Sequence, residues 1–346
     1  MLRVGLLGFG LAGRSFHAPL LRAAGMRLAA VVTSRSEAVR EAAADADVLA
    51  SDAELLERND IDVIVVATPN LLHAAQAEAA LRAGKHVVVD KPLSVTAREA
   101  THLAQLARER SLMLAVFQNR RWDSDFLTLR KLIESGDLGE LHTFRARWDR
   151  FRPAVVDRWK DRAGQGNGML YDLGSHLADQ ALHLFGRPDW IQADVMMQRT
   201  GAVIDDAFEI VMGKGALRIS LAAGSIAAAG DWRYVLHGSR ASFFKPGLDP
   251  QEDQLRDGMD PLAPQFGIEP ESQWGKLVDG ASGESSPIPS QRGHWPAFYA
   301  GVRRSIETGA PAPVTADEAA TTIEILEAAL RSSAEHRRVD LSPART

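Results

Sequence analysis

The sequence contains no cysteine among its 346 residues. Disulfide bonds, thiolate nucleophiles, iron–sulfur clusters and thiolate zinc sites are therefore excluded, so the chemistry must use oxygen and nitrogen groups. The same absence favours a compartment that is not oxidising. We expect a cytoplasmic protein.

An excess of positive charge and a long hydrophobic run are also missing. The 40 Lys and Arg residues face 45 Asp and Glu residues without any basic tract, so the electrostatic pattern of a nucleic-acid-binding protein is absent. The apolar stretch within residues 1–16 is too short for a membrane span and lacks the small-residue cleavage site of a signal peptide. We therefore expect a small-molecule substrate, with no nucleic acid and no membrane as partner.

What the chain does contain is enough apolar sequence for two domains. Hydrophobic residues make up 45% of it, and domains of roughly 100 to 200 residues are usual. Short β-branched runs within residues 3–8, 28–34, 62–69, 86–92 and 112–119 alternate with alanine-rich stretches, and Ser94 and Thr96 predict the start of one crossover helix. The pattern predicts an α/β domain over residues 1–121, with a parallel sheet between helices.

Residues 122–346 predict a second domain of a different kind. The pattern predicts a helix at 124–135, a strand at 141–148, a helix at 169–185 and then several strands of a predominantly antiparallel sheet, closed by helices that begin near residues 294 and 316. The segment 245–292, rich in Pro, Gly and Asp up to residue 271, predicts a long surface excursion; loops of this kind usually serve as lids or oligomer contacts, and the sequence does not indicate the role of this one.

A glycine pattern follows the first predicted strand directly. Gly8, Gly10 and Gly13 form GFGLAG between a strand and a helical stretch, which is the context of a dinucleotide site. Gly8 permits the tight turn, Gly10 lets the backbone approach a pyrophosphate, and Gly13 allows close helix packing, while the helix start supplies N–H donors. An ordinary turn is the alternative.

The end of the second predicted strand indicates which dinucleotide binds. An NAD site normally places Asp or Glu there, whereas this strand ends in Thr33, Ser34 and Arg35. A guanidinium group and two hydroxyls suit a 2′-phosphate, since Arg forms bidentate bonds to phosphate. We therefore predict NADP; Glu37 leaves NAD open, and a solvated arginine is the other reading of Arg35.

Lys91 ends the apolar run 86–90, where open α/β sheets bind their ligands. A lysine at this end of a strand is explained if its ammonium group polarises a substrate hydroxyl or carbonyl and stabilises the developing alkoxide. Asp90 is placed to orient it, and Pro92 stiffens the exit from the strand. An ordinary surface lysine is the alternative.

The predicted helix 169–185 carries a carboxylate and an imidazole four residues apart. Asp172 would fix the tautomer of His176, which can then accept a hydroxyl proton near neutral pH. Gly174 is unfavourable inside a helix, which predicts that another group approaches its backbone closely. An exposed, weakly stabilising Asp/His pair is the alternative, and a zinc site lacks an evident third ligand, so we expect no metal.

Several strings together resemble a known family along nearly the whole chain. GFGLAG with FHAPL behind it, AGKHVVVDKP, and YDLGSHLADQALHLFG are similar in order and spacing to the Gfo/Idh/MocA family of NAD(P)-dependent sugar and cyclitol oxidoreductases. TSR, FQNRRWDSDFLTLRKLI and WDRFRPAVVDRW resemble the branch whose members are NADPH-dependent scyllo-inositol 2-dehydrogenases. The resemblance implies an N-terminal Rossmann domain and a C-terminal α/β domain whose open sheet forms a homodimer.

The resemblance also implies roles for individual residues. Lys91, Asp172 and His176 would be catalytic, with His176 as the proton acceptor. Where this chain has Asp90 the family usually has Glu, one methylene longer. The cofactor contacts, from the turn and from the resemblance together, would be Gly8, Phe9, Gly10, Leu11, Ala12, Gly13, Thr33, Ser34, Arg35, Thr68, Pro69, Asn70, His73, Asp90, Lys91, Asn119, Arg121 and Trp159.

The predicted function is a reversible dehydrogenase reaction on the CH–OH group of a cyclitol or sugar. His176 would remove the hydroxyl proton while Lys91 stabilises the oxyanion. Candidates for binding the other substrate hydroxyls are Arg150, Arg152, Tyr171 and Asp179. The alternatives are the same apparatus acting on an aldose or another sugar derivative, and a non-catalytic NADP-binding sensor.

Overall fold

The computed structural model describes residues 1–156 and 161–341 and divides into two compact units. Unit 1 comprises Met1–Trp122, Pro250–Gly267 and His294–Ala320, and unit 2 comprises Asp123–Asp249, Ile268–Gly293 and Thr321–Thr346. Each unit is thus assembled from three stretches of chain. The division of the chain into domains at residues 121 and 122 stays a prediction.

Unit 1 is built on a six-stranded sheet in which every neighbouring pair is parallel, in the order β3-β2-β1-β4-β5-β6. The strand order reverses beside β1, which creates the switch point where such sheets bind ligands. The five predicted strands are confirmed, and β3 is an addition that has only three residues, none of them buried, and so no apolar run to reveal it. The strands are β1 (Arg3–Leu7), β2 (Arg27–Val32), β3 (Asp47–Leu49), β4 (Val63–Val66), β5 (His86–Asp90) and β6 (Leu114–Phe117).

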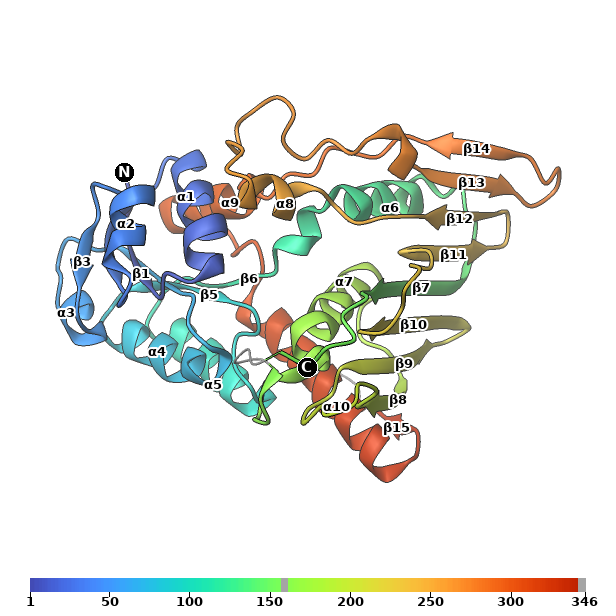
Figure 1. Cartoon of the computed structure of the whole chain (residues 1–346), viewed down its shortest axis with the longest axis horizontal. Helices are drawn as coiled ribbons and strands as arrows, with labels where there is room; N and C mark the ends of the chain where they lie inside the picture. Colours follow the sequence, from blue (N-terminus) through green and yellow to red (C-terminus); the bar gives the residue numbers. More distant parts are fainter. Residues whose placement is uncertain (157–160, 342–346) are drawn as a thin grey trace. The chain divides into compact units, whose positions relative to one another are not determined.

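Helices cover both faces of this sheet, with α4 and α5 on one side and α1 and α9 on the other (Figure 1). The predicted start of α5 is confirmed by a capping box, in which Thr96 and Glu99 each accept a backbone N–H of the other. The helices of unit 1 are η1 (Ala12–His17, a π-helix), α1 (Ala18–Ala23), α2 (Ser36–Ala42), α3 (Asp52–Leu56), α4 (Asn70–Arg82), α5 (Ala97–Glu109), η2 (Asn119–Trp122), α8 (Gln251–Arg256) and α9 (Pro296–Thr308).

Unit 2 is built on a nine-stranded sheet in the order β14-β13-β12-β11-β7-β10-β9-β8-β15. Its pairs are antiparallel except β7 with β10, so the prediction of a predominantly antiparallel sheet is confirmed. The strands are β7 (Leu141–Asp149), β8 (Trp190–Met196), β9 (Ala207–Lys214), β10 (Leu217–Gly224), β11 (Tyr234–Gly238), β12 (Ala241–Lys245), β13 (Gly275–Asp279), β14 (Ser285–Ile288) and β15 (Val339–Asp340).

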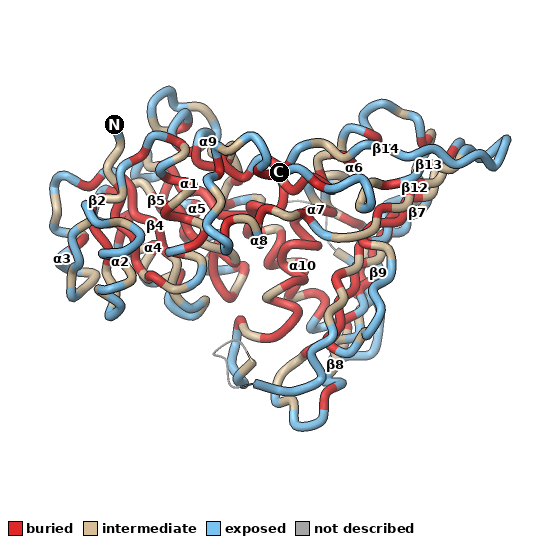
Figure 2. The backbone as a smooth tube through the Cα atoms, turned by 45° about the horizontal axis from the view of Figure 1, so that its top comes forward, coloured by how far each residue is buried: buried red, intermediate tan, exposed pale blue. Residues whose placement is uncertain are grey.

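One face of this sheet forms the core with three helices. Side chains of α6 (Ser124–Ser135), α7 (Ser175–Phe185) and α10 (Ala316–Glu335) join the inward side chains of β7, β9 and β11, among them Phe144, Phe208 and Tyr234. Figure 2 shows the resulting buried stretches along α7 and α10. Within the described residues, no helix combines the length and the apolar character needed to cross a bilayer.

Two details of the second predicted domain are wrong. The first part of the helix 169–185 is a π-helix, η4 (Leu170–Gly174), so the 3.6-residue period assumed there does not hold. The segment from Lys245 is not simply a surface excursion, since it contains α8, leads into β13 and β14, and buries Lys245 and Glu269 completely or almost so. The Lys245 ammonium and the Glu269 carboxylate neutralise each other at a distance of 2.8 Å, and this pairing cannot be read from the sequence.

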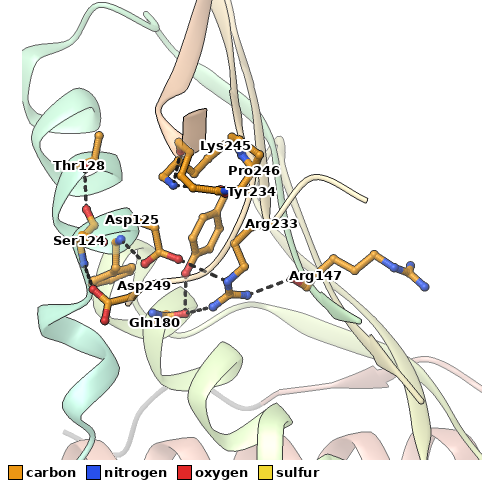
Figure 3. A network of polar contacts seen from close by, with 12 residues as sticks. Ser124, Asp125, Thr128, Arg147, Gln180, Arg233, Tyr234, Lys245, Pro246 and Asp249 are labelled. Carbon is orange, nitrogen blue, oxygen red and sulfur yellow. Dashed lines mark hydrogen bonds and ion pairs between the residues drawn. The ribbon is translucent and has the colours of Figure 1, made fainter. Parts of the chain in front are cut away.

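That ion pair belongs to a buried polar network in unit 2 (Figure 3). The Lys245 ammonium also donates to the carbonyl oxygens of Pro246 and Gln273, at 2.9 and 2.7 Å. Nearby, the Arg233 guanidinium donates to Gln180 Oε1 and the Arg147 carbonyl, both at 3.2 Å, and lies 3.6 Å from Asp125. Tyr234 donates its hydroxyl proton to the same Gln180 oxygen at 2.8 Å. The network ties α6 and α7 to the sheet.

Candidate functional site

Each position in the turn after β1 is glycine for a different local reason. Gly8 has φ +91°, and a Cβ there would lie 2.6 Å from the Ala67 carbonyl oxygen; a Cβ at Gly13 would lie 2.5 Å from the Gly8 carbonyl oxygen. At Gly10 a Cβ would meet nothing within 4 Å. Two of the glycines are therefore needed for packing, while Gly10 leaves open backbone at the carboxyl end of β1. This open backbone fits the close approach of a pyrophosphate.

The residues predicted to contact the ribose 2′ position of the dinucleotide follow β2. The Arg35 N–H donates to Thr33 Oγ1 at 3.1 Å, which fixes the turn into α2. Ser34 and Arg35 are exposed, and so is Glu37 in the first turn of α2. The guanidinium group is thus accessible to a ligand beside the glycine turn of the same unit.

His73 links two loops at the carboxyl edge of the unit 1 sheet. Its side chain is buried, with Nδ1 2.7 Å from the Pro92 carbonyl oxygen and Nε2 2.8 Å from the Thr68 carbonyl oxygen. His73 therefore ties the loop after β4 to the loop after β5. Pro69 ends the loop after β4, and Asn70 is the first residue of α4.

Asp90 and Lys91 occupy the carboxyl end of β5. Asp90 Oδ1 accepts the Lys91 backbone N–H at 2.8 Å, the Lys91 side chain is half-buried, and the Lys91–Pro92 peptide bond is cis. Burial pushes the pKa of Asp90 upward, but its interaction with His17 and the charges of Lys91 and His73 outweigh burial and hold that pKa below its ordinary value. A negative charge is thereby kept beside the lysine.

The remaining cofactor candidates of unit 1 follow β6. Asn119 and Arg121 are buried in η2, and the Arg121 guanidinium donates to Glu318 Oε1 at 2.7 Å. Burial alone would raise the pKa of Glu318, but the charge and hydrogen bond of Arg121 and the bonds from Thr315 bring it below its ordinary value. Phe9 is buried and Leu11 exposed in the glycine turn. Trp159 lies outside the described residues.

Unit 2 carries Asp172 and His176 on the continuous helix formed by η4 and α7. Asp172 is half-buried and lies 3.8 Å from the Arg150 guanidinium, whereas His176 is buried with its ring 6.2 Å from that of Trp148. The predicted close approach at Gly174 is confirmed, because a Cβ there would lie 3.0 Å from Leu170 Cδ1, with the Phe208 ring at 3.4 Å. Tyr171 and Asp179, expected to bind substrate, are both buried.

A polar pocket opens beside the first turn of this helix. Three arginines and four aspartates line it with Gly168, Met169 and Ser225; the charged residues are Arg150, Arg152, Arg199, Asp161, Asp172, Asp205 and Asp206. Asp205 Oδ2 accepts the Leu170 backbone N–H at 2.7 Å, and burial raises the pKa of Asp205 to about 6. Sequence reasoning missed Asp205 and Arg199, although the acidic pair at 205–206 directly before a strand was a visible signal.

Metal ligation finds no support within residues 1–156 and 161–341, where no three His, Asp or Glu side chains are grouped as a metal site requires.

Comparison with known proteins gives the family. Residues 2–118 match the model of an oxidoreductase family with an NAD-binding Rossmann fold, and residues 130–341 match that of the C-terminal alpha/beta domain of the same family. The chain belongs to the Gfo/Idh/MocA family of oxidoreductases. The family resemblance, the two fold types and the prediction of an oxidoreductase are confirmed.

Individual Gfo/Idh/MocA relatives are similar over nearly their whole length. The scyllo-inositol 2-dehydrogenase (NADP(+)) IolW of Bacillus subtilis is 41% identical over 98% of this chain and 96% of its own. The oxidoreductase YdgJ of Escherichia coli, whose function is uncharacterized, is 41% identical over 97% of each chain. The solved structure of the oxidoreductase YvaA from Bacillus subtilis matches with a TM-score of 0.96 and 41% identity over 99% of this chain and 98% of that one.

Proposed function

We propose that the protein is an NADP-dependent dehydrogenase that transfers hydride reversibly between a secondary alcohol of a cyclitol, of the scyllo-inositol type, and nicotinamide. The observation that carries the proposal is in unit 1. The open backbone at Gly10 and the lysine at the end of β5 lie at the carboxyl edge of one parallel sheet, beside its switch point. The similarity to IolW supports the substrate class.

NADP is proposed over NAD because of the residues after β2. Ser34 and Arg35 offer a hydroxyl and an exposed guanidinium to a 2′-phosphate, and Arg pairs with phosphate through two parallel hydrogen bonds. Glu37 is the carboxylate that would serve NAD instead. Measuring both dinucleotides in parallel decides between them.

The proposed mechanism uses three side chains. Bound nicotinamide supplies a carbon that accepts or returns the hydride. His176 accepts the substrate hydroxyl proton, Asp172 orients the imidazole, and the Lys91 ammonium stabilises the alkoxide that develops on the substrate oxygen. In the reducing direction His176 returns the proton to the same oxygen.

The polar pocket of unit 2 supports a polyol as substrate. Its arginines donate hydrogen bonds and its aspartates accept them, so the pocket offers a substrate hydroxyl both a donor and an acceptor. Arg150 and Arg152 line this pocket with Asp172 and are proposed to bind substrate hydroxyls. Charges of both signs also suit a neutral polyol better than an acidic sugar.

The deciding experiment supplies purified protein with scyllo-inositol, myo-inositol and common aldoses, with NADP and NAD in parallel, and follows absorbance at 340 nm. We expect NADP reduction with scyllo-inositol, and K91M should abolish it. Turnover of an aldose alone would keep the mechanism and move the substrate. No turnover with any substrate, despite tight NADP binding, would favour the sensor.

The glycine turn offers a matched pair of variants for cofactor binding. G10A places its methyl group in open space, so thermal stability should stay unchanged while the dissociation constant of NADP rises at least about tenfold. G13A places its methyl group 2.5 Å from the Gly8 carbonyl oxygen, so it should cost about 1–3 kcal/mol of stability. Calorimetric titration and thermal melts separate the two, and unaltered NADP affinity in G10A would contradict the proposed site.

We also propose a homodimer through the outer face of the unit 2 sheet. The strand registers align Val211, Ser220, Arg145, Val235 and Phe244 in one row on the face opposite the core. Val211 and Arg145 are exposed and Phe244 is partly exposed, so the row offers apolar and charged groups to a second copy of the chain. Light scattering after size exclusion tests this, and V211E should yield a monomer.

A further inference from the structure

A chain of three polar side chains lies behind the end of β5. His17, the last residue of η1, is fully buried and packs against Phe117 with a ring-centroid distance of 4.5 Å. Its Nδ1 is 2.7 Å from the hydroxyl oxygen of Tyr299 on α9, and its Nε2 is 3.8 Å from Asp90 Oδ2. The three residues come from η1, β5 and α9, all within unit 1.

The direction of the hydrogen bonds follows from the tyrosine. Burial, and after it the charge of Asp90, raises the pKa of Tyr299 well above its ordinary value, so the phenol keeps its proton. The phenol can then donate to Nδ1 of a neutral imidazole, which places the ring proton on Nε2. That Nε2–H faces the Asp90 carboxylate and has no hydrogen-bond partner among the described residues.

Asp90 divides its two oxygens between two tasks. Oδ1 accepts the backbone N–H of Lys91 at 2.8 Å, and Oδ2 faces His17. The 3.8 Å separation from His17 is an electrostatic contact, since an N–H···O bond to a carboxylate is about 2.8 Å long. The positive end of the Nε2–H dipole therefore holds Oδ2 in place and, with it, keeps Oδ1 on the Lys91 backbone.

We propose that Tyr299 and His17 are positioning residues for Lys91, acting through the carboxylate of Asp90. Tyr299 fixes the tautomer of His17, His17 orients Asp90, and Asp90 sets the backbone and the charge beside the lysine. The part of this inference that concerns catalysis rests on the proposed function of Lys91. The tautomer itself does not, and it is tested separately.

The first arm uses nitrogen NMR of protein labelled with ¹⁵N-histidine, without substrate, with His17 assigned from its loss in H17Q. At pH 8 we expect Nε2 protonated and Nδ1 bare in the wild-type protein, and a redistribution of the proton between the two nitrogens in Y299F. A wild-type proton on Nδ1 at this pH, or a His17 signal that Y299F leaves unchanged, would overturn the chain of hydrogen bonds.

The second arm measures turnover. Y299F and H17Q should each lower kcat about tenfold, with the dissociation constant of NADPH unchanged within about twofold. Y234F is the matched control, because Tyr234 is also fully buried and also makes one hydroxyl hydrogen bond, to Gln180 at 2.8 Å in unit 2. Y234F should lose stability as Y299F does while keeping kcat; equal losses of kcat in both variants would show a merely structural role.

The third arm asks whether the effect passes through Asp90. D90N removes the charge, so Y299F should lower kcat no further in the D90N background. Independent, multiplying effects of the two substitutions would overturn the relay. If K91M instead retains turnover, the proposed role of Lys91 fails, and the NMR result on the tautomer is unaffected by that failure.

Discussion

Each unit of the molecule buries a lysine, and the two ammonium groups are held in different ways. In unit 2 the Lys245 ammonium lies 2.8 Å from the Glu269 carboxylate and donates to two carbonyl oxygens as well. In unit 1 the Lys85 ammonium donates to the carbonyl oxygens of Arg58 and Ile61, at 2.8 and 2.9 Å, and the described residues show no carboxylate paired with it. Lys85 also keeps slight solvent contact, whereas Lys245 has none.

The difference teaches what each lysine does for its neighbours. A carbonyl that loses its donor remains a neutral dipole, while a buried carboxylate that loses its cation becomes an uncompensated charge. Lys245 therefore makes a carboxylate tolerable inside unit 2, where Glu269 also accepts the hydroxyl of Ser290 at 2.6 Å. Lys85 closes the turn that leads into β5 and supports nothing charged.

The largest effect is expected from K245M. Methionine fills a similar volume but leaves Glu269 buried without its cation, so the free energy of unfolding should fall by about 3–5 kcal/mol. Urea denaturation of the variant measures the loss. The double variant K245M/E269Q removes both charges and should recover a substantial part of it; a single variant as stable as the wild type would refute the assigned importance of the pair.

K85M should cost less, about 1–3 kcal/mol, because only hydrogen bonds from a charged donor to neutral carbonyls are lost. The same urea series compares it directly with K245M. A K85M loss equal to or larger than that of K245M would break the contrast between a cation held by the backbone and one held by a carboxylate.

The same contrast explains how much the sequence alone could predict. Strands of unit 1 such as Val63–Val66 are buried on both faces and predicted as apolar runs, and the glycine turn and Lys91 are marked by spacing beside those runs. The pairing of Lys245 with Glu269 joins residues 24 positions apart across a stretch rich in Pro, Gly and Asp, so nothing local indicated that either is buried. His17 was likewise visible only as part of FHAPL, and its contact with Tyr299 spans 282 residues.

Asp205 extends the comparison to a carboxylate that the backbone holds, and it carries the smallest expected effect. Burial raises its pKa from 3.8 to about 6, against the backbone hydrogen bonds from Leu170 and Met169, which lower it. Because the folded pKa lies above the unfolded one, Asp205 contributes stability that is fully present below about pH 4 and is lost as the pH rises to about 7.

D205N keeps an oxygen acceptor for the Leu170 N–H and removes the charge. The difference in free energy of unfolding between D205N and the wild type should therefore increase by about 1–2 kcal/mol from pH 4 to pH 7. This is less than the whole pKa shift of Asp205 would give, because its side chain is only partly buried. Urea denaturation at both pH values measures this, and D206N is the control: the pKa of Asp206 is lowered, so its stabilising contribution is already present above about pH 4, and the same comparison for D206N should change little between pH 4 and pH 7. The cause of the lowering is that the hydrogen bonds from Gln198 and Arg199 outweigh burial, so the charge of Asp206 is stabilising where that of Asp205 is not. An equal rise in both variants would mean that the two carboxylates are not distinguished by what holds them, which is backbone N–H groups for Asp205 and backbone N–H groups together with the Arg199 guanidinium for Asp206.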